Sequence, residues 1–277
     1  MQEKAPLHRN YPGDPEGAAQ YCDICGKEIK LLGNRKLDDG NMCKDCAAKL
    51  SPWFSDRRHS TKAEIQEQLA YREQNQTAVA DFHTTRSLGK STKLLLDEDA
   101  RKFMVTDAKD LAQANPDVLD YSQVTGCDLD IDERRTEKKR TDKDGKSVSY
   151  VPPRYEYSYE FTAVIRVNHP YFDEMSIQIS NGYVHTGETA MGTAANSGWT
   201  VNRKQGILTS QGVAEYNECV KTGNEIKRVV DGMRNEIRRE VRAAAAPKAA
   251  VTCPWCGATT VPDASGCCEY CGGTVNG

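Results

Sequence analysis

Residues 22–26 read Cys-Asp-Ile-Cys-Gly, and residues 43–46 read Cys-Lys-Asp-Cys. Near the other end of the chain, residues 253–257 read Cys-Pro-Trp-Cys-Gly and residues 268–272 read Cys-Glu-Tyr-Cys-Gly. Each end therefore carries two Cys-x-x-Cys pairs, and together the pairs use eight of the 11 cysteines. Seventeen residues separate the two pairs at the start and 11 separate them at the end, which is spacing typical of four-cysteine zinc ribbons.

Four thiolates at tetrahedral corners are a favoured ligand set for a structural zinc ion. Two cysteines separated by two residues can turn both sulfur atoms toward one ion, and a glycine after the second cysteine suits the turn. A full shell of four thiolates leaves no open position for a catalytic water, so we expect both sites to be structural. The expected ligands of the two Zn²⁺ ions are Cys22, Cys25, Cys43, Cys46, Cys253, Cys256, Cys268 and Cys271. Cys267 is the alternative to Cys268, which is preferred because it restores the two-residue spacing.

Three other uses of these cysteines stay open. A disulfide framework is disfavoured because the cysteine count is odd, the pairs are adjacent and the N-terminus lacks the apolar core of a signal peptide. A redox dithiol needs one such pair opening a helix in a βαβ unit, whereas this chain has four pairs in two matched sets. Iron accepts the same shell of thiolates and remains the alternative metal.

Composition excludes some classes of protein and sets the scale of the fold. The 277 residues suffice for two or three units, with a central domain large enough for a real core. The 37 basic and 40 acidic residues give a net charge of −3, so there is no global attraction to nucleic acid or to anionic membranes. No run of apolar residues approaches the length of a membrane span. Together with reduced thiols, this composition predicts a cytoplasmic protein.

The predicted fold class is α+β, with a β-rich central domain and a long C-terminal helix between two small zinc ribbons. The expected segments are a flexible leader (1–20), an N-terminal ribbon (21–52), a connecting helix (60–80), the central domain (81–246), a linker (247–252) and a C-terminal ribbon (253–277). Within the central domain the long helix is expected at about 209–246, with an apolar stripe that packs on the sheet.

Local sequence patterns predict the connecting helix and the main strands of the central domain. Thr61 and Glu64 form a capping box that begins the connecting helix, which we expect to be mostly exposed. Residues 97–99 are all acidic and are expected to form the solvated turn of a hairpin. Apolar and polar residues alternate over residues 155–168, which predicts the strongest strand of the protein.

Two segments are rich in basic residues. Residues 134–146 carry seven basic and three acidic side chains around an Asp144-Gly145 turn, so we expect a long solvated β-hairpin tip, with a phosphate-contacting finger as the alternative. The helix face over 227–248 mixes arginine and lysine with glutamate. His185 and Glu188 are too small a constellation to name a catalyst.

The first cysteine cluster also resembles a known family. Residues 22–26 (Cys-x-Ile-Cys-Gly) precede residues 36–40 (Lys-Leu-x-Asp-Gly), and this order resembles a bacterial zinc-ribbon domain family of unknown function. The region from Phe82 to about Ile179 is similar to the strand-rich segment that often follows this ribbon, and the strands with their long helix resemble a pleckstrin-homology-like bacterial domain. The C-terminal cluster is similar to generic ribbons of bacterial adaptor proteins. The resemblance implies fold and metal but no activity.

Three functions compete at this point. The first is a non-catalytic adaptor or scaffold whose ribbons dock protein partners through the exposed aromatic residues Trp53, Phe54, Trp255 and Tyr270; packing of Trp53 and Phe54 under the ribbon is the alternative. The second is a nucleic-acid-binding protein that uses the basic hairpin 134–146 and the helix face 227–248. The third is an enzyme, for which we find no nucleophile elbow, phosphate loop or His/Glu metal motif. Partner identity and oligomeric state are beyond the sequence.

Overall fold

The computed structural model describes residues 19–188, 210–245, 250–263 and 265–275. The chain divides into two compact units, one reaching to Met233 and the other beginning at Arg234. Helices and strands are mixed, so the predicted α+β class is confirmed. Residues 1–18 of the predicted leader and 247–249 of the predicted linker lie outside the described residues, whereas Gln20 and Val251–Thr252 belong to strands. No helix among the described residues is long and apolar enough to cross a membrane.

The first unit begins with a small module built around the first cysteine cluster. Its strands form two two-stranded sheets, β1 with β2 and β3 with β4. A one-turn helix, α1, follows β4 directly, and a 3₁₀ turn at Asp56–His59 closes the module. The bounds are β1 Gln20–Tyr21, β2 Glu28–Ile29, β3 Asn34–Lys36, β4 Asn41–Cys43 and α1 Lys44–Ala47.

Helix α2 (Lys62–Ala80) begins with the predicted capping box, because the side chains of Thr61 and Glu64 each bond the other residue's backbone N–H. The expectation that this helix is mostly exposed is confirmed, since more than half of its residues are exposed, but one stripe is not. An inner stripe of α2 is buried, and much of it is polar: Ile65, Gln68, Arg72, Asn75 and Val79. Polar side chains conceal such a stripe from a hydropathy pattern, because their burial depends on hydrogen-bond partners elsewhere in the chain.

The first large sheet has the order β5-β6-β7-β8 with antiparallel neighbours. The predicted hairpin is β6–β7, but Asp97 is only 2 % exposed rather than solvated. Its carboxylate accepts the backbone N–H groups of His83 and Ala100, which lower its pKa. The buried Asp97 carboxylate therefore stabilises the β6–β7 turn through hydrogen bonds to the backbone. The bounds are β5 Arg86–Leu88, β6 Lys93–Asp97, β7 Lys102–Thr106, α3 Leu111–Ala114, β8 Leu119–Asp120 and the 3₁₀ turn Tyr121–Gln123.

The second large sheet is built on the predicted strand, β10. On one side β10 pairs with β9 along nearly its whole length, and on the other it pairs with β11 and then β12. The predicted alternation is confirmed, since Tyr159, Phe161 and Ala163 are fully buried on one face. The bounds are β9 Val124–Thr141, β10 Ser147–Val167, β11 Glu174–Gln178 and β12 Val184–Gly187.

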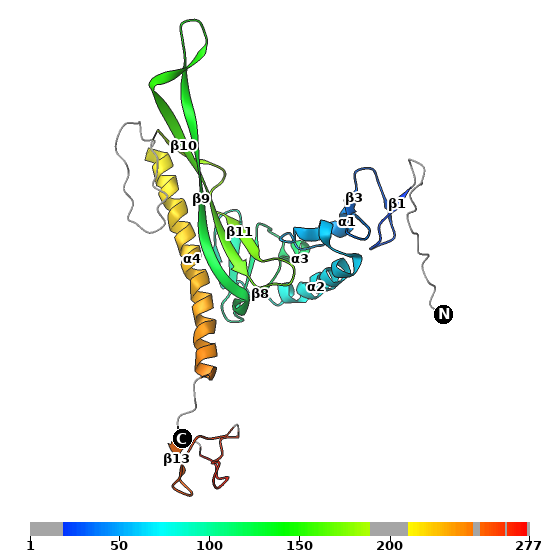
Figure 1. Ribbon diagram of the computed structural model, residues 1–277, viewed down its shortest axis with the longest axis vertical. Helices are drawn as coiled ribbons and strands as arrows, with labels where there is room; N and C mark the ends of the chain where they lie inside the picture. Colours follow the sequence, from blue (N-terminus) through cyan, green and yellow to red (C-terminus); the bar gives the residue numbers. More distant parts are fainter. Residues whose placement is uncertain (1–18, 189–209, 246–249, 264, 276–277) are drawn as a thin grey trace. The chain divides into compact units, whose positions relative to one another are not determined.

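The outer part of the β9–β10 hairpin forms an arm. Residues 147–149 and 154–156 of β10 pair with β9 but with no other described strand, and Figure 1 shows β9 and β10 running past β11. The turn uses Gly145 at φ +77°, and the Asp142 carboxylate accepts the N–H groups of Asp144 and Lys146. The predicted hairpin over 134–146 is therefore confirmed.

Helix α4 (Ser210–Ala245) confirms the predicted long helix, and its apolar stripe packs on the sheet. The Tyr216 ring meets the rings of Tyr159 and Phe161 edge-on, at centroid distances of 4.8 and 4.9 Å. Gly223 lies about two helical turns after Tyr216 on the same stripe, and the space around it is closely filled. A Cβ atom at Gly223 would lie 2.5 Å from Leu129 Cδ1 and 3.1 Å from Ile179 Cδ1. The glycine thus permits close approach of helix and sheet.

The two glycines of α4 make a matched pair for a stability measurement. We expect Gly223→Ala to lower the free energy of unfolding by about 1–3 kcal/mol through overpacking against the sheet. Gly232 has no neighbour within 4 Å of an added Cβ, so Gly232→Ala is expected to raise stability by about 0.5–1 kcal/mol. Urea unfolding of both variants checks this; equal effects of the same sign would contradict the packing role of Gly223.

Candidate metal centres

The sulfur atoms of the first cluster come from two different local structures. Cys22 and Cys25 lie on a turn between β1 and β2, in which the Gly26 N–H donates to the Cys22 carbonyl at 2.8 Å and Gly26 has φ +71°. Cys43 is the last residue of β4 and the N-cap of α1, and Cys46 lies in that helix. The second pair is therefore held by a helix start and not by a second hairpin turn. Ala47, in place of the usual glycine, is the sequence signal for this difference.

The first cluster is compact enough to hold one ion. Cys22 Sγ is 3.9 Å from Cys46 Sγ, and Cys25 Sγ is 3.8 Å from Cys43 Sγ. A tetrahedron with Zn–S bonds of about 2.3 Å has sulfur–sulfur edges of about 3.8 Å. All four sulfur atoms lie within 4.8 Å of one another. The donor set and its spacing therefore fit a tetrahedral metal ion.

Backbone N–H groups prepare the first cluster for ionised sulfur. The Cys43 N–H donates to Cys22 Sγ at 3.2 Å, and the Cys46 N–H donates to Cys43 Sγ at 3.4 Å. Burial alone would raise the pKa of Cys22, but hydrogen bonds from the backbone of Cys43, Cys25 and Ile24 lower that pKa to about 7. A thiolate is the form that binds metal, and these N–H groups favour it at Cys22, whereas burial and the neighbouring sulfur atoms raise the pKa of Cys46.

The second cluster consists of two nearly identical turns. In each, the glycine N–H donates to the first cysteine's carbonyl, Gly257 to Cys253 at 2.9 Å and Gly272 to Cys268 at 2.8 Å. Cys253 Sγ is 3.6 Å from Cys271 Sγ, and Cys256 Sγ is 3.7 Å from Cys268 Sγ. Strands β13 (Val251–Thr252) and β14 (Thr259–Thr260) flank the first turn. This cluster also fits one tetrahedral ion.

Cys267 is not part of the second cluster, which contains Cys268 instead. The Cys267 thiol lies near the Ser265 carbonyl, at 3.9 Å, and its backbone forms a β-bridge with Thr274. The pKa of Cys268 is lowered to about 7, because backbone hydrogen bonds from Cys271 and Tyr270 outweigh the effect of burial. The structure thus favours the ligand assignment that restores the two-residue spacing.

The first module is joined to the rest of its unit by a buried polar network. Asp117 is fully buried and accepts hydrogen bonds from Ser51 Oγ (2.8 Å), Tyr71 OH (3.1 Å) and Arg72 Nη1 (2.8 Å). Arg72 Nε also donates to the Lys49 carbonyl at 3.1 Å, just after α1. No sequence pattern indicated this network, which links the first module, α2 and the loop before β8.

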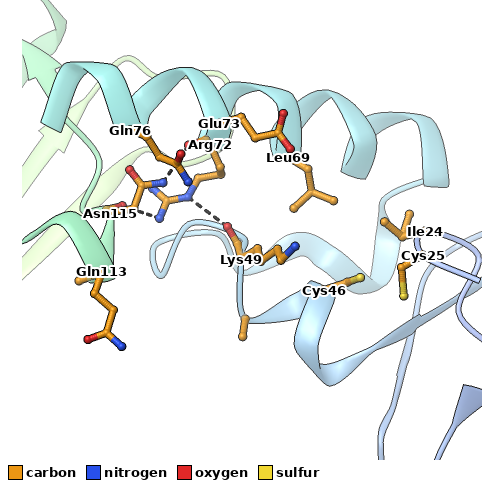
Figure 2. Close-up of a pocket in the computed structure, with 12 residues that line it drawn as sticks. Ile24, Cys25, Cys46, Lys49, Leu69, Arg72, Glu73, Gln76, Gln113 and Asn115 are labelled. Atoms are coloured by element: carbon orange, nitrogen blue, oxygen red, sulfur yellow. Dashed lines mark hydrogen bonds between the residues drawn. The ribbon is translucent and has the colours of Figure 1, made fainter. Parts of the chain in front are cut away.

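A cavity of about 410 Å³ lies beside the first cluster. Figure 2 shows Ile24, Cys25 and Cys46 on one side, with side chains of α2 and the end of α3 on the other. Arg72 borders this cavity, and its guanidinium bonds to the carbonyls of Lys49 and Asn115. The cavity therefore has a rigid wall beside the exposed sulfur of Cys25.

The four aromatic residues predicted to bind partners occupy different environments. Phe54 is partly buried against the core of the first module. Trp53 lines a second cavity of about 510 Å³, and its indole Nε1 is buried without a hydrogen-bond partner among the described residues. Trp255 and Tyr270 in the C-terminal module are 74 % and 71 % exposed. Partner binding by these residues stays a prediction.

A family model described as a domain of unknown function (DUF4428) matches residues 20–68. The match covers the first cysteine cluster and the beginning of α2, a small part of the chain. No curated protein and no solved structure matches this chain. The expected likeness of the central region to a pleckstrin-homology-like domain stays a prediction.

Proposed function

We propose that this chain is a non-catalytic zinc-binding adaptor or scaffold that docks a protein partner through its C-terminal module. The eight clustered cysteines would hold two Zn²⁺ ions, and each ion would supply folding free energy to its small module. Iron fits the same four-thiolate shells and is the alternative metal.

The observation that carries the proposal is an exposed indole held in place by its own module. Trp255 is 74 % exposed, yet its Nε1 donates to the Thr274 carbonyl at 3.1 Å. The ring also lies against Gly273, where an added Cβ would come within 2.6 Å of Trp255 Cδ1. An aromatic side chain that is exposed and already ordered loses little entropy on binding, which is typical of interface anchors. Tyr270, 71 % exposed, gives the same small module a second aromatic side chain.

The proposal is tested by affinity capture from a nuclease-treated lysate of the source cells. We expect a defined protein partner that is lost in the double variant Trp255→Ala/Tyr270→Ala. The control is Tyr21→Ala in the N-terminal module, because Tyr21 is also largely exposed, at 59 %. Each variant must retain the metal content of the wild type. Equal capture by all three proteins would refute the docking role of the C-terminal aromatics.

A second function, binding of duplex nucleic acid, is favoured by the hairpin arm. Lys139, Arg140, Lys143 and Lys146 are exposed near its tip and have no carboxylate partner among the described residues. A two-stranded β-ribbon has the width that the major groove of DNA admits. If affinity capture recovers nucleic acid with the chain, and nuclease treatment removes the co-purified proteins, nucleic-acid binding would replace protein docking as the first function. Replacing these four basic residues of the arm by glutamate would then abolish the recovery of nucleic acid.

A further inference from the structure

Three polar side chains form a row across the sheet at the base of the arm. Arg134 of β9 lies opposite Ser158 of β10, and Ser158 lies opposite His185 of β12. Directly opposite residues of antiparallel strands point to the same face and are near neighbours. Tyr159, the next residue, points to the face that packs on α4, so the row lies on the other face.

These three side chains line a cavity of about 230 Å³, together with Thr136, Glu156, Tyr157 and Tyr183. Ser158 is only 7 % exposed, and its hydroxyl has no hydrogen-bond partner among the described residues. Ser158 lines the cavity, where its hydroxyl can donate and accept a hydrogen bond.

Among the charged side chains around the cavity, the Arg134 guanidinium is not paired with a carboxylate of the described residues. Glu156 lies 3.1 Å from Lys138 Nζ, and Glu188 is held by Lys138 at 3.3 Å and by Arg154 at 2.8 Å. Glu156 and Glu188 are thus neutralised, whereas Asp132 and Glu160, the next opposed pair along this face, have no cationic partner among the described residues. Arg134 has no carboxylate partner among the described residues, and its guanidinium lies over the Tyr183 ring, 5.8 Å from the centroid. That contact orients the guanidinium while its N–H donors stay free.

We propose that this cavity binds the phosphate group of a small phosphate monoester. A guanidinium can donate two parallel hydrogen bonds to a phosphate, and the Ser158 hydroxyl and His185 ring lie beside it in the same row. Residues 134–156 carry eight basic and four acidic side chains, whereas residues 128–133 of the same strand carry four acidic and no basic ones. Tyr183 lines the cavity, and its ring can contact the organic part of an ester.

The test is a titration of the full chain with inorganic phosphate and, separately, with adenosine 5′-monophosphate at constant ionic strength. Binding is followed by nuclear magnetic resonance through the signals of the His185 ring. These signals are identified because they are missing from the spectrum of the His185→Gln variant. We expect a saturable shift that weakens about tenfold in Arg134→Gln, because a charge-assisted hydrogen-bond donor is lost. Ser158→Ala is expected to weaken binding in the same direction. The control is Lys143→Gln, which removes one charge from the arm's tip and leaves the cavity intact.

Each outcome decides the proposal. Tighter binding of the nucleotide identifies an organic ester as the ligand, and equal binding identifies phosphate alone; both support the site. No saturable shift in either titration would overturn it. Equal weakening by Arg134→Gln and Lys143→Gln would also overturn it, because attraction would then come from the arm's charge and not from the cavity. Arg134 is exposed, so its replacement is not expected to disturb folding.

Discussion

Replacing Asp117 by alanine is expected to lower the free energy of unfolding of the N-terminal unit by about 3–5 kcal/mol. Asp117 is fully buried and bonds Ser51, Tyr71 and Arg72. Arg72 is itself only 6 % exposed, so the variant leaves a buried guanidinium without its counter-ion. The cost of an uncompensated buried charge, and not the loss of one hydrogen bond, sets the size of the effect.

Urea unfolding measures this effect, and Asp128→Ala is the control. Asp128 pairs with Arg166 and Lys227 in the same unit, but its side chain is about half exposed. An exposed ion pair contributes at most about 1 kcal/mol. If Asp117→Ala costs no more than Asp128→Ala, the buried network does not join the metal module to its unit.

Metal removal is the second large effect, and we expect it to differ between the modules. The buried core of the C-terminal module consists of Cys253, Cys268 and Val275, with Val251 packed against it. Two of these three buried residues belong to the cysteine cluster that could hold the ion, so without metal almost no core would remain. Structural zinc in small domains contributes about 10–16 kcal/mol of binding free energy at neutral pH. We therefore expect this module to unfold completely.

The N-terminal module has a larger buried hydrophobic core than the C-terminal module. Its buried cluster adds Ile29, Leu37, Met42, Leu50 and Ile65 to the three buried ligands, and Ile65 belongs to α2. We expect metal removal to release the turn that carries Cys22 and Cys25, and to lower the stability of α2. Hydrogen exchange with and without chelator measures this for each segment. Full protection of α2 in the metal-free chain would show that the module is independent of its unit.

The elements that could be predicted from sequence depend on local patterns. The cysteine spacing predicts both clusters, the alternation over 155–168 predicts β10, and the 3.6-residue stripe predicts α4. The capping box at Thr61 places the start of α2 correctly. Each of these signals lies within one short window of the chain.

The features that escaped prediction depend on residues far apart in the sequence. The inner stripe of α2 is polar, and Arg72 finds its partner 45 residues away in Asp117. The row of Arg134, Ser158 and His185 depends on strand register, which shifts between Ser149 and Arg154. No local pattern fixes that shift, so the row is visible only once the strands are paired.

The most direct test of the account is the metal content of the purified full chain, measured by elemental analysis beside native mass spectrometry. We predict two zinc ions per chain, one after Cys22→Ser or Cys268→Ser, and two after Cys267→Ser, which replaces a cysteine outside both clusters. A folded chain without metal, or with its paired cysteines oxidised to disulfides, would contradict the account.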